Sequence, residues 1–510
     1  MKKVKTLLCR SLWMTVFVGI FSACSTEKEN YLSSLPAESS MVFKMNVTQL
    51  VEKSNVLNNP LVSAALLQLD QQVPESLQEQ YAEIKQNPQA IGIDLQQPLA
   101  IAVSAADVDN PQIVAVAAVS DVKKLNALLE KLTETDGSFT IEQAGNGVKQ
   151  LIFPDNKELN CAYNDSRLVL TNRTDVVALT SQKAESSILA DQNFKDLADC
   201  RKDLALFMDY DWIIELLKQQ PLPEGTLTPS TLQLLEGCAL FCEVNFETGK
   251  VVGSSQIYGN EELLKYQKEF YATPSGKFLG LLPADSYVAV NAATKNLNKA
   301  WELCSPIESQ QIEEALQKVG LTPDIFNSID GDIQLGVYND ESNVMGIPGI
   351  VLAIQCKDRT LFDSVTRMTG KAPAGNDSAD KDIIEMMGYV VAFIDNSLVA
   401  CPKALYDQCL AGGNIKPLKD NIQATPWGNT LKKGGIVIDF QSISRNKTLN
   451  QLTYQKNVAA TLAVLKQLEA WTIQTDSPTK SIGELTLMDK NKNSLEQLIT
   501  IGISAAMAVR

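Results

Sequence analysis

Histidine is absent from all 510 residues of this chain. Its absence excludes Ser-His-Asp and Cys-His nucleophilic catalysis, imidazole acid–base chemistry near neutral pH, and metal sites built on imidazole ligands. Most common hydrolase mechanisms are excluded with it. Catalysis by two carboxylates stays open, because a glycosidase needs only a pair of acids about 5 to 9 Å apart across a sugar-binding cleft.

Other features are scarce as well. The formal net charge is −15, and we expect no nucleic-acid partner, because phosphate binding depends on clustered Lys and Arg. The chain has no phosphate-binding glycine loop and no paired cysteine spacing typical of zinc, so we expect neither a cofactor nor a metal. Aromatic residues make up 6% of the chain, which weakens the case for a sugar-binding platform.

The N-terminus is typical of a bacterial lipoprotein signal. Basic residues between Lys2 and Arg10 precede an apolar stretch from Leu12 to Phe21, and the small pair Ser22-Ala23 precedes Cys24. We expect residues 1–23 to be removed as a signal peptide and Cys24 to be acylated. The alternative is a transmembrane helix, but this apolar stretch is too short to cross ~30 Å of hydrocarbon.

This signal predicts where the mature protein is found. No other stretch of about 18 apolar residues follows, so we expect the lipid to be the attachment to the membrane, through a tether of residues 24–34. Ser25 follows the outer-membrane sorting pattern of bacterial lipoproteins. We therefore expect a lipid-anchored protein of the cell envelope, in the outer membrane, facing the periplasm or the cell surface.

The chain contains an internal repeat. Leu35–Ser39 recurs as Leu282–Ser286, and a strand-like run follows each copy. Further along, Ala162–Val169 aligns with Ala392–Val399 at a spacing of 230 residues, the distance from Asp165 to Asp395. The same spacing aligns Leu206–Tyr210 with Ile436–Phe440 and Gly253 with Gly483. A repeat this long predicts tandem domains, with boundaries at 35–275 and 278–510.

Each copy is predicted to be an α+β domain with an antiparallel sheet. Two segments have an apolar helical face, Asp121–Leu132 and Thr360–Met368. Hairpin turns are predicted at Asp165-Ser166 and Asp395-Asn396. Apolar runs predict buried strands; these are Leu99–Val103, Ile113–Val119, Leu168–Leu170, Ile350–Ile354 and Ile436–Ile438.

Four aspartates are candidate ligand-binding residues. Asp209 and Asp439 occupy equivalent places at strand ends, and Asp165 and Asp395 occupy equivalent places in turns. Either pair is suited to holding a ligand. The alternative is structural, because Asp at a strand end caps the following helix and Asp in a hairpin makes the turn. We identify no catalytic residue.

Cysteines and tryptophans have a plain structural interpretation. Besides Cys9 and Cys24 the chain has eight cysteines, most of them in apolar runs, which favours buried thiols. Cys238 and Cys242 would lie ~13 Å apart along one strand, too far for a disulfide. Four tryptophans are predicted to belong to the core; these are Trp212, Trp301, Trp427 and Trp471.

The repeated opening motif and the segment Ile91–Pro98, which precedes a strand, carry a family resemblance. Together with the signal and the length, they resemble an uncharacterised Bacteroidetes lipoprotein family, domain of unknown function 4836. The resemblance implies envelope location and no activity, cofactor or catalytic residue. We therefore expect a non-catalytic binding or structural module with a protein, peptide or glycan partner. The alternative is a carboxylate-dependent enzyme acting on glycans.

Overall fold

The computed structural model describes residues 30–58, 73, 77–104, 110–219, 229–302, 306–318, 320–340, 347–370, 382–411 and 413–509. The predicted signal peptide, Cys24 and Cys304 lie outside these residues. The chain divides into two compact units. Unit 1 comprises Met1–Leu216, Gly237–Thr248 and Lys492–Ile499; unit 2 comprises Leu217–Glu236, Gly249–Asn491 and Thr500–Arg510.

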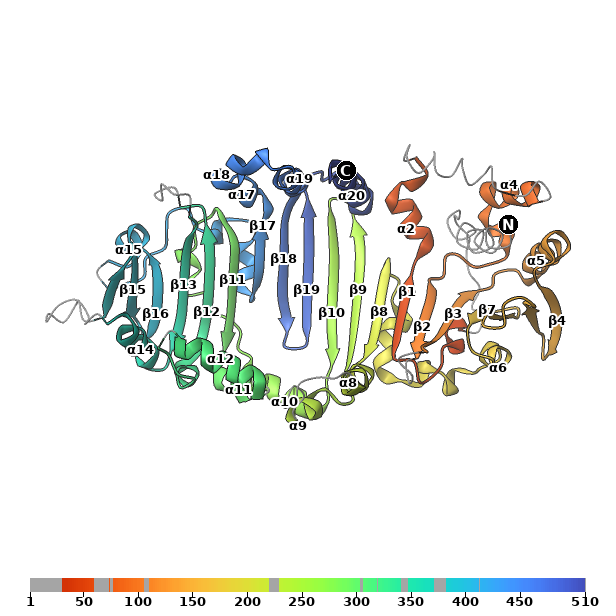
Figure 1. Ribbon diagram of the computed structural model, residues 1–510, viewed down its shortest axis with the longest axis horizontal. Coiled ribbons are helices and arrows are strands. Elements are labelled where there is room, and N and C mark those ends of the chain that lie inside the picture. The colour runs from red at the N-terminus through yellow and green to blue at the C-terminus, as the bar shows by residue number, and fades with distance from the viewer. Residues whose placement is uncertain are drawn as a thin grey trace. The chain divides into compact units, whose positions relative to one another are not determined.

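Unit 1 contains an antiparallel sheet. From one edge to the other, its hydrogen-bonded strands are β4 (Thr140–Gly145), β5 (Val148–Ile152), β6 (Asn160–Tyr163), β7 (Arg167–Thr171), β3 (Gln112–Ala118), β2 (Leu99–Ser104), β1 (Met41–Met45), β8 (Leu204–Asp209) and β9 (Ala239–Glu247). Its main helices are α2 (Val47–Ser54), α4 (Gln78–Gln86), α5 (Val122–Asp136), α6 (Val176–Thr180) and α7 (Lys195–Asp199) (Figure 1).

Unit 2 also contains an antiparallel sheet. Its strands follow the order β14 (Ile383–Met386), β15 (Tyr389–Ile394), β16 (Ser397–Pro402), β13 (Gly349–Cys356), β12 (Ile329–Tyr338), β11 (Ser286–Thr294), β17 (Gly435–Asp439), β18 (Leu468–Ser477), β19 (Lys480–Leu487) and β10 (Lys250–Tyr258). Its helices include α9 (Pro229–Leu235), α10 (Glu261–Phe270), α11 (Leu297–Glu302), α12 (Pro306–Lys318), α13 (Ile325–Ser328), α14 (Thr360–Thr369), α15 (Lys403–Cys409), α16 (Gly428–Lys432), α17 (Phe440–Ser444), α18 (Lys447–Gln451) and α19 (Lys456–Leu465). Helix α8 (Tyr210–Gln219) and helix α20 (Ser494–Val509) each pass from one unit into the other.

The prediction of an α+β fold with antiparallel sheets is confirmed. The five predicted strands coincide with β2, β3, β7, β13 and β17, and the two predicted helices coincide with α5 and α14. Helix α5 shows why the local pattern was sufficient. Asp121 caps it by accepting hydrogen bonds from the amides of Lys123 and Lys124, and the helix ends at Gly137 with a φ of 62°.

A hydrophobic core covers part of one face of each sheet. In unit 2 this core contains Ala289, Val351, Ala353 and Val437 from the sheet, packed against residues 278–282 and helices α15 and α16. In unit 1 the buried positions of β1 and β8, Val42 and Phe207 among them, lie on the covered face. A second cluster covers part of the opposite face in each unit. It joins Ala117 and Leu168 to helix α5 in unit 1, and Ile333 and Ile354 to helices α13 and α14 in unit 2.

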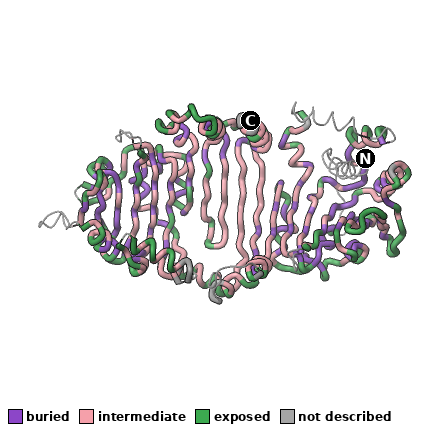
Figure 2. The backbone as a smooth tube through the Cα atoms, in the orientation of Figure 1, coloured by how far each residue is buried: buried purple, intermediate pink, exposed green. Residues whose placement is uncertain are grey.

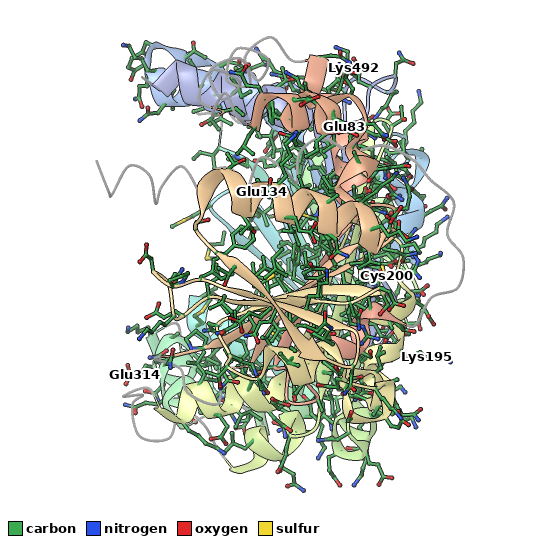
Figure 3. The ribbon with its side chains drawn as sticks, turned by 90° about the vertical axis from the view of Figure 1, so that its right-hand side faces the viewer. Glu83, Glu134, Lys195, Cys200, Glu314 and Lys492 are labelled. Carbon is green, nitrogen blue, oxygen red and sulfur yellow. The ribbon has the colours of Figure 1, made fainter. Side chains whose placement is uncertain are left out.

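A buried lysine anchors the covered face of unit 1. Lys44 in β1 is 2% exposed, and its Nζ donates hydrogen bonds to the carbonyl oxygens of Leu197, Ala198 and Cys200 at 2.5, 3.0 and 3.1 Å. These carbonyls end helix α7, so the ammonium satisfies acceptors that the helix leaves open. Figure 3 labels Lys195 and Cys200, which bound this segment. Burial, with a smaller contribution from Arg201, lowers the pKa of Lys44 to about 8.

This buried lysine predicts a pH effect on stability. Because the folded-state pKa lies below the unfolded value of 10.5, the unfolded chain binds more protons between pH 8 and 10.5, and the contribution of Lys44 to stability increases with pH. Urea unfolding of the wild type and of Lys44→Met at pH 7.5 and pH 10 measures it. The free energy of unfolding of the wild type, minus that of Lys44→Met, should be about 2 kcal/mol larger at pH 10 than at pH 7.5. An unchanged difference would contradict the burial of a titrating lysine, since other alkaline groups are common to both proteins.

Candidate functional site: the open face of each sheet

The register of β11 places its side chains alternately on the two faces of the unit 2 sheet. Ala289 and Asn291 are fully buried, whereas Val288 and Val290 are only partly buried. Directly opposite residues of paired strands point to the same face. Val290 lies opposite Leu335 of β12 and Ile436 of β17, so the partly buried valines belong to a larger surface.

We call this surface the open face of unit 2. It extends over seven strands from β13 to β10, through register pairs such as Trp471 with Leu485 and Leu485 with Val251. At its β13 end, Ile333 and Ile354 are covered by the cluster that includes helices α13 and α14. The apolar side chains of the remainder are Ile350, Leu352, Leu335, Val337, Val288, Val290, Ile436, Ile438, Trp471, Ile473, Leu485 and Val251.

The open face is apolar and accessible to solvent. Ile350 is 45% exposed, Trp471 41% and Ile436 37%. None of the register positions that face this side on the seven strands carries a charged residue. The remaining positions near β10 are small or hydroxylic, with Gly253 opposite Gly483. An antiparallel sheet normally presents polar side chains on its solvated face.

Figures 1 and 2 show the lack of cover directly. No helix crosses the middle of β18, β19 and β10 (Figure 1), and all three strands are of intermediate burial along most of their length (Figure 2). The prediction of buried strands is therefore wrong for one face of β13 and β17, whereas Leu168 and Val169 of β7 are buried as predicted. The prediction that Trp471 belongs to the core is wrong, because its side chain is 41% exposed on the open face.

Unit 1 has an open face of the same kind. It is formed by alternate residues of β2, β1, β8 and β9, and Ile113 of β3, 43% exposed, lies at its margin. No charged residue occupies any of the positions facing this side on the four strands. Leu99 of β2, on the same side, packs against the cluster around helix α5. The other apolar residues of this face are Ile101, Val103, Met41, Phe43, Met45, Leu204, Leu206, Met208, Leu240, Cys242 and Val244.

The two predicted strand-end aspartates have structural contacts. Asp439 is the N-cap of α17 and accepts hydrogen bonds from the amide of Ser442 at 2.9 Å and from its hydroxyl at 3.0 Å. Asp209, at the end of β8, accepts from the amide of Asp211 at 2.9 Å, and burial raises the pKa of its carboxyl. These are the contacts of a helix cap and of a turn.

The two turn aspartates lie where the hairpins were predicted. Asp165 is exposed in the turn between β6 and β7. Asp395, in the turn between β15 and β16, has a φ of 50°, a conformation that Asp and Asn adopt more readily than most residues. Its carboxylate is 2.6 Å from Nζ of Lys277.

Within each unit the two candidate aspartates are not brought together. In unit 1, β7 and β8 are four strand spacings apart, or ~19 Å, and Asp165 precedes β7 while Asp209 ends β8, which places them at opposite ends of the strands. Asp395 and Asp439 have the same relation in unit 2. A carboxylate pair for glycoside hydrolysis lies within about 10 Å. Ligand binding by these residues stays a prediction.

The cysteines of the described ranges are mostly buried thiols. Seven cysteines in the described ranges are free, and all except Cys242 are buried, which confirms the buried-thiol interpretation for those six. Burial raises the pKa of Cys161 to about 12. Over the described residues, no three Cys, Asp or Glu side chains gather as metal ligands. None of the helices there has both the length and the hydropathy that crossing a bilayer requires.

If Asp439 acts as a helix cap, its replacement should change the free energy of unfolding. Asp439→Ala should lower the free energy of unfolding by about 1 kcal/mol, whereas Asp439→Asn retains an acceptor and should cost much less. Asp395→Asn is the matched control, since it loses only an exposed ion pair worth under about 1 kcal/mol. Chemical denaturation measures all three. Equal stability of the Ala and Asn variants at position 439 would refute the cap.

Comparisons with known proteins give one family match. A family model described as "Domain of unknown function (DUF4836)" matches residues 31–398. No curated protein matches the chain. A solved structure titled "Structure of crystal form I of TP0453" is 9% identical and has a TM-score of 0.26, with coverage of 47% of this chain and 81% of that one. At this TM-score the likeness carries no argument.

Proposed function

Because the chain belongs to the family described as domain of unknown function 4836, a description that names no activity, we propose its function from its own surfaces. The protein is a non-catalytic binding module of the bacterial cell envelope, anchored by a lipid on Cys24. Its open faces bind a partner protein that presents an apolar surface. The observation that carries this proposal is the open face of unit 2.

The physical basis is the cost of leaving this surface in water. Each large apolar side chain contributes about 1.5–3 kcal/mol when it is fully buried, and Ile350, Ile436 and Trp471 are each more than one-third exposed. Contiguous apolar patches on soluble proteins mark interaction sites. A sheet face is broad and nearly flat, which suits a protein surface better than a small ligand. The register positions on the open face carry no charged residue. The face therefore offers no pair of carboxylates for the alternative function, a carboxylate-dependent enzyme acting on glycans.

The proposed anchor would hold the fold close to the membrane. Cys24 precedes Asn30, the first described residue, by six residues, a reach of about 20 Å when extended. The first described residues are attached to the rest of unit 1, because the hydroxyl of Tyr31 donates a 2.6 Å hydrogen bond to the carbonyl oxygen of Pro98. We place the protein in the outer membrane, facing the periplasm or the cell surface, on the basis of Ser25.

We also propose that the chain is two tandem copies of one domain, residues 35–275 and 278–510. The order of strand pairings supports this. The pairings β1–β2, β2–β3, β3–β7, β6–β7, β5–β6, β1–β8 and β8–β9 recur as β11–β12, β12–β13, β13–β16, β15–β16, β14–β15, β11–β17 and β17–β18.

Equivalent hydrogen bonds also support the duplication. The hydroxyl of Ser39 donates to the carbonyl of Pro36 at 2.7 Å, and that of Ser286 donates to Pro283 at 2.7 Å. Asn291 is in the place of Lys44, and it also donates to a carbonyl of a short helix, at Leu431 in α16. On this proposal β10 belongs to the first copy by sequence, although its contacts place it in unit 2.

The anchor predicts a change of fraction when Cys24 is replaced. Cys24→Ser removes the thiol that is acylated, so the protein should move from the membrane fraction to the soluble fraction of lysed cells. Immunoblots of both fractions measure this, and Cys9→Ser, in the signal, is the matched control that should stay with the membrane. An unchanged membrane fraction for Cys24→Ser would contradict lipid anchoring.

The open face predicts position-specific crosslinking. A photoreactive amino acid at Ile436 or Ile350 should capture one reproducible envelope protein in intact cells, whereas the same group at Glu142, exposed in β4, should not. Ile436→Asp should abolish capture from position 350, because binding would bury an unpaired carboxylate. Circular dichroism of the Asp variant verifies folding. Capture that is equal from all three positions, or none together with glycan turnover by the purified protein, would reject the proposal.

A further inference from the structure

One connecting segment at an end of the unit 2 sheet carries charge of one sign, beside acidic residues such as Asp340 and Glu469 that flank it. Residues 440–467, which join β17 to β18 through α17, α18 and α19, carry Arg445, Lys447, Lys456 and Lys466 and no Asp or Glu. All four basic residues are exposed. The chain as a whole has 60 acidic and 45 basic residues. The net charge of this segment is therefore positive, opposite in sign to that of the whole chain. We call residues 440–467 the basic cap.

The proposed duplication supplies an internal comparison. Residues 210–238 join β8 to β9 and occupy the matching place in the first copy. That segment holds one Lys and four acidic residues, Asp211, Glu215, Glu224 and Glu236. The matching connection is acidic, so the fold does not require basic residues at this place, and the charge of the basic cap needs a separate cause.

Exposed apolar side chains accompany the basic residues. Tyr454, between α18 and α19, is 77% exposed. Met488, which directly follows β19, is 48% exposed and is held beside the cap by a 3.0 Å hydrogen bond from its amide to the carbonyl of Gln467. Helix α19 contains only one charged residue, Lys456. Basic side chains with a tyrosine and apolar residues are typical of segments that lie at a membrane–water interface.

The cap is held rigidly on the end of the sheet. Gln441 donates to the carbonyl of Leu468 at 2.5 Å, and Asn446 donates to Oδ1 of Asn339 at 2.8 Å. Asp439 caps α17 at its base. Figure 1 shows α17, α18 and α19 gathered beyond the same ends of β17 and β18. Binding by a preorganised surface avoids the entropy cost of ordering it.

We propose that the basic cap docks on the surface of an anionic lipid bilayer. The proposal deepens the proposed function, because a protein anchored near Asn30 is held within reach of such a surface. The chain from Cys24 onward has a net charge of −19, since residues 1–23 hold four basic residues and no acid. An anionic bilayer repels this acidic chain and attracts the cap, so the cap selects which end of unit 2 faces the lipid.

Vesicle co-sedimentation tests this with the mature chain carrying Cys24→Ser, which has no lipid of its own. The protein should pellet with vesicles of phosphatidylcholine mixed with phosphatidylglycerol, and not with phosphatidylcholine alone. High salt should release it, because the Debye length falls from about 10 Å at 0.1 M to about 3 Å at 1 M.

Replacing lysines of the basic cap by glutamate tests whether the cap is the surface that binds the vesicles. Lys447→Glu, Lys456→Glu and Lys466→Glu combined should weaken partitioning at least roughly 100-fold, since each basic residue near an anionic surface contributes on the order of fivefold. Lys157→Glu, Lys195→Glu and Lys202→Glu combined make the same charge change at exposed positions of unit 1 and should retain most of the binding. Tyr454→Ser should cause a smaller loss.

The outcomes separate this proposal from the lipid anchor and from a protein partner. Equal loss in both triple variants, no loss in either, or equal pelleting with both kinds of vesicle would overturn it. Matching thermal unfolding of the two triple variants shows that a loss of binding is not a loss of folding. Because the assay uses unacylated protein, its result does not depend on whether Cys24 carries a lipid in cells.

Discussion

The antiparallel register of the central strands is the constraint on which the rest of each unit depends. In β11, one set of alternate residues enters the core, and the other set, with Val288 and Val290, joins the open face. A slip of one residue against β12 or β17 would exchange the two sets. Such a slip would place Asn291 on the apolar surface and remove its hydrogen bond to Leu431. Buried polar anchors therefore select one register.

Those anchors also attach the connecting segments to the covered face. Asp332 of β12 is 2% exposed and accepts hydrogen bonds from the amide and hydroxyl of Ser275 and from the amide of Gly276 at 2.7 to 2.9 Å. Lys44 performs a related function in unit 1 through helix α7. With the buried polar groups arranged in this way, the open face presents apolar side chains to solvent, at a cost in stability and solubility that the proposed partner binding would recover.

The local predictions succeeded where neighbouring residues contain the information. Helix α5 was predicted from its apolar face, and the hairpin turn at Asp395 from residues that tolerate a positive φ. The candidate aspartates were placed correctly on their elements, since caps and turns are local. The exposure of Trp471 was not predicted, because its neighbours in sequence are compatible with either face of a sheet. The basic cap was also missed, although its lack of acidic residues is visible in the sequence.

The sequence by itself determined some of the strands, helices and turns, the antiparallel α+β class, the family resemblance and the chemistry that a chain without histidine cannot perform. These follow from composition and from contacts between residues close along the chain. Only the tertiary structure decided which parts of each sheet face are covered, that Asp165 and Asp209 lie at opposite ends of their strands, and that Met488 lies beside the basic cap. Apolar alternation indicates that a face avoids water, but long-range packing decides whether the chain itself covers that face or leaves it for a partner.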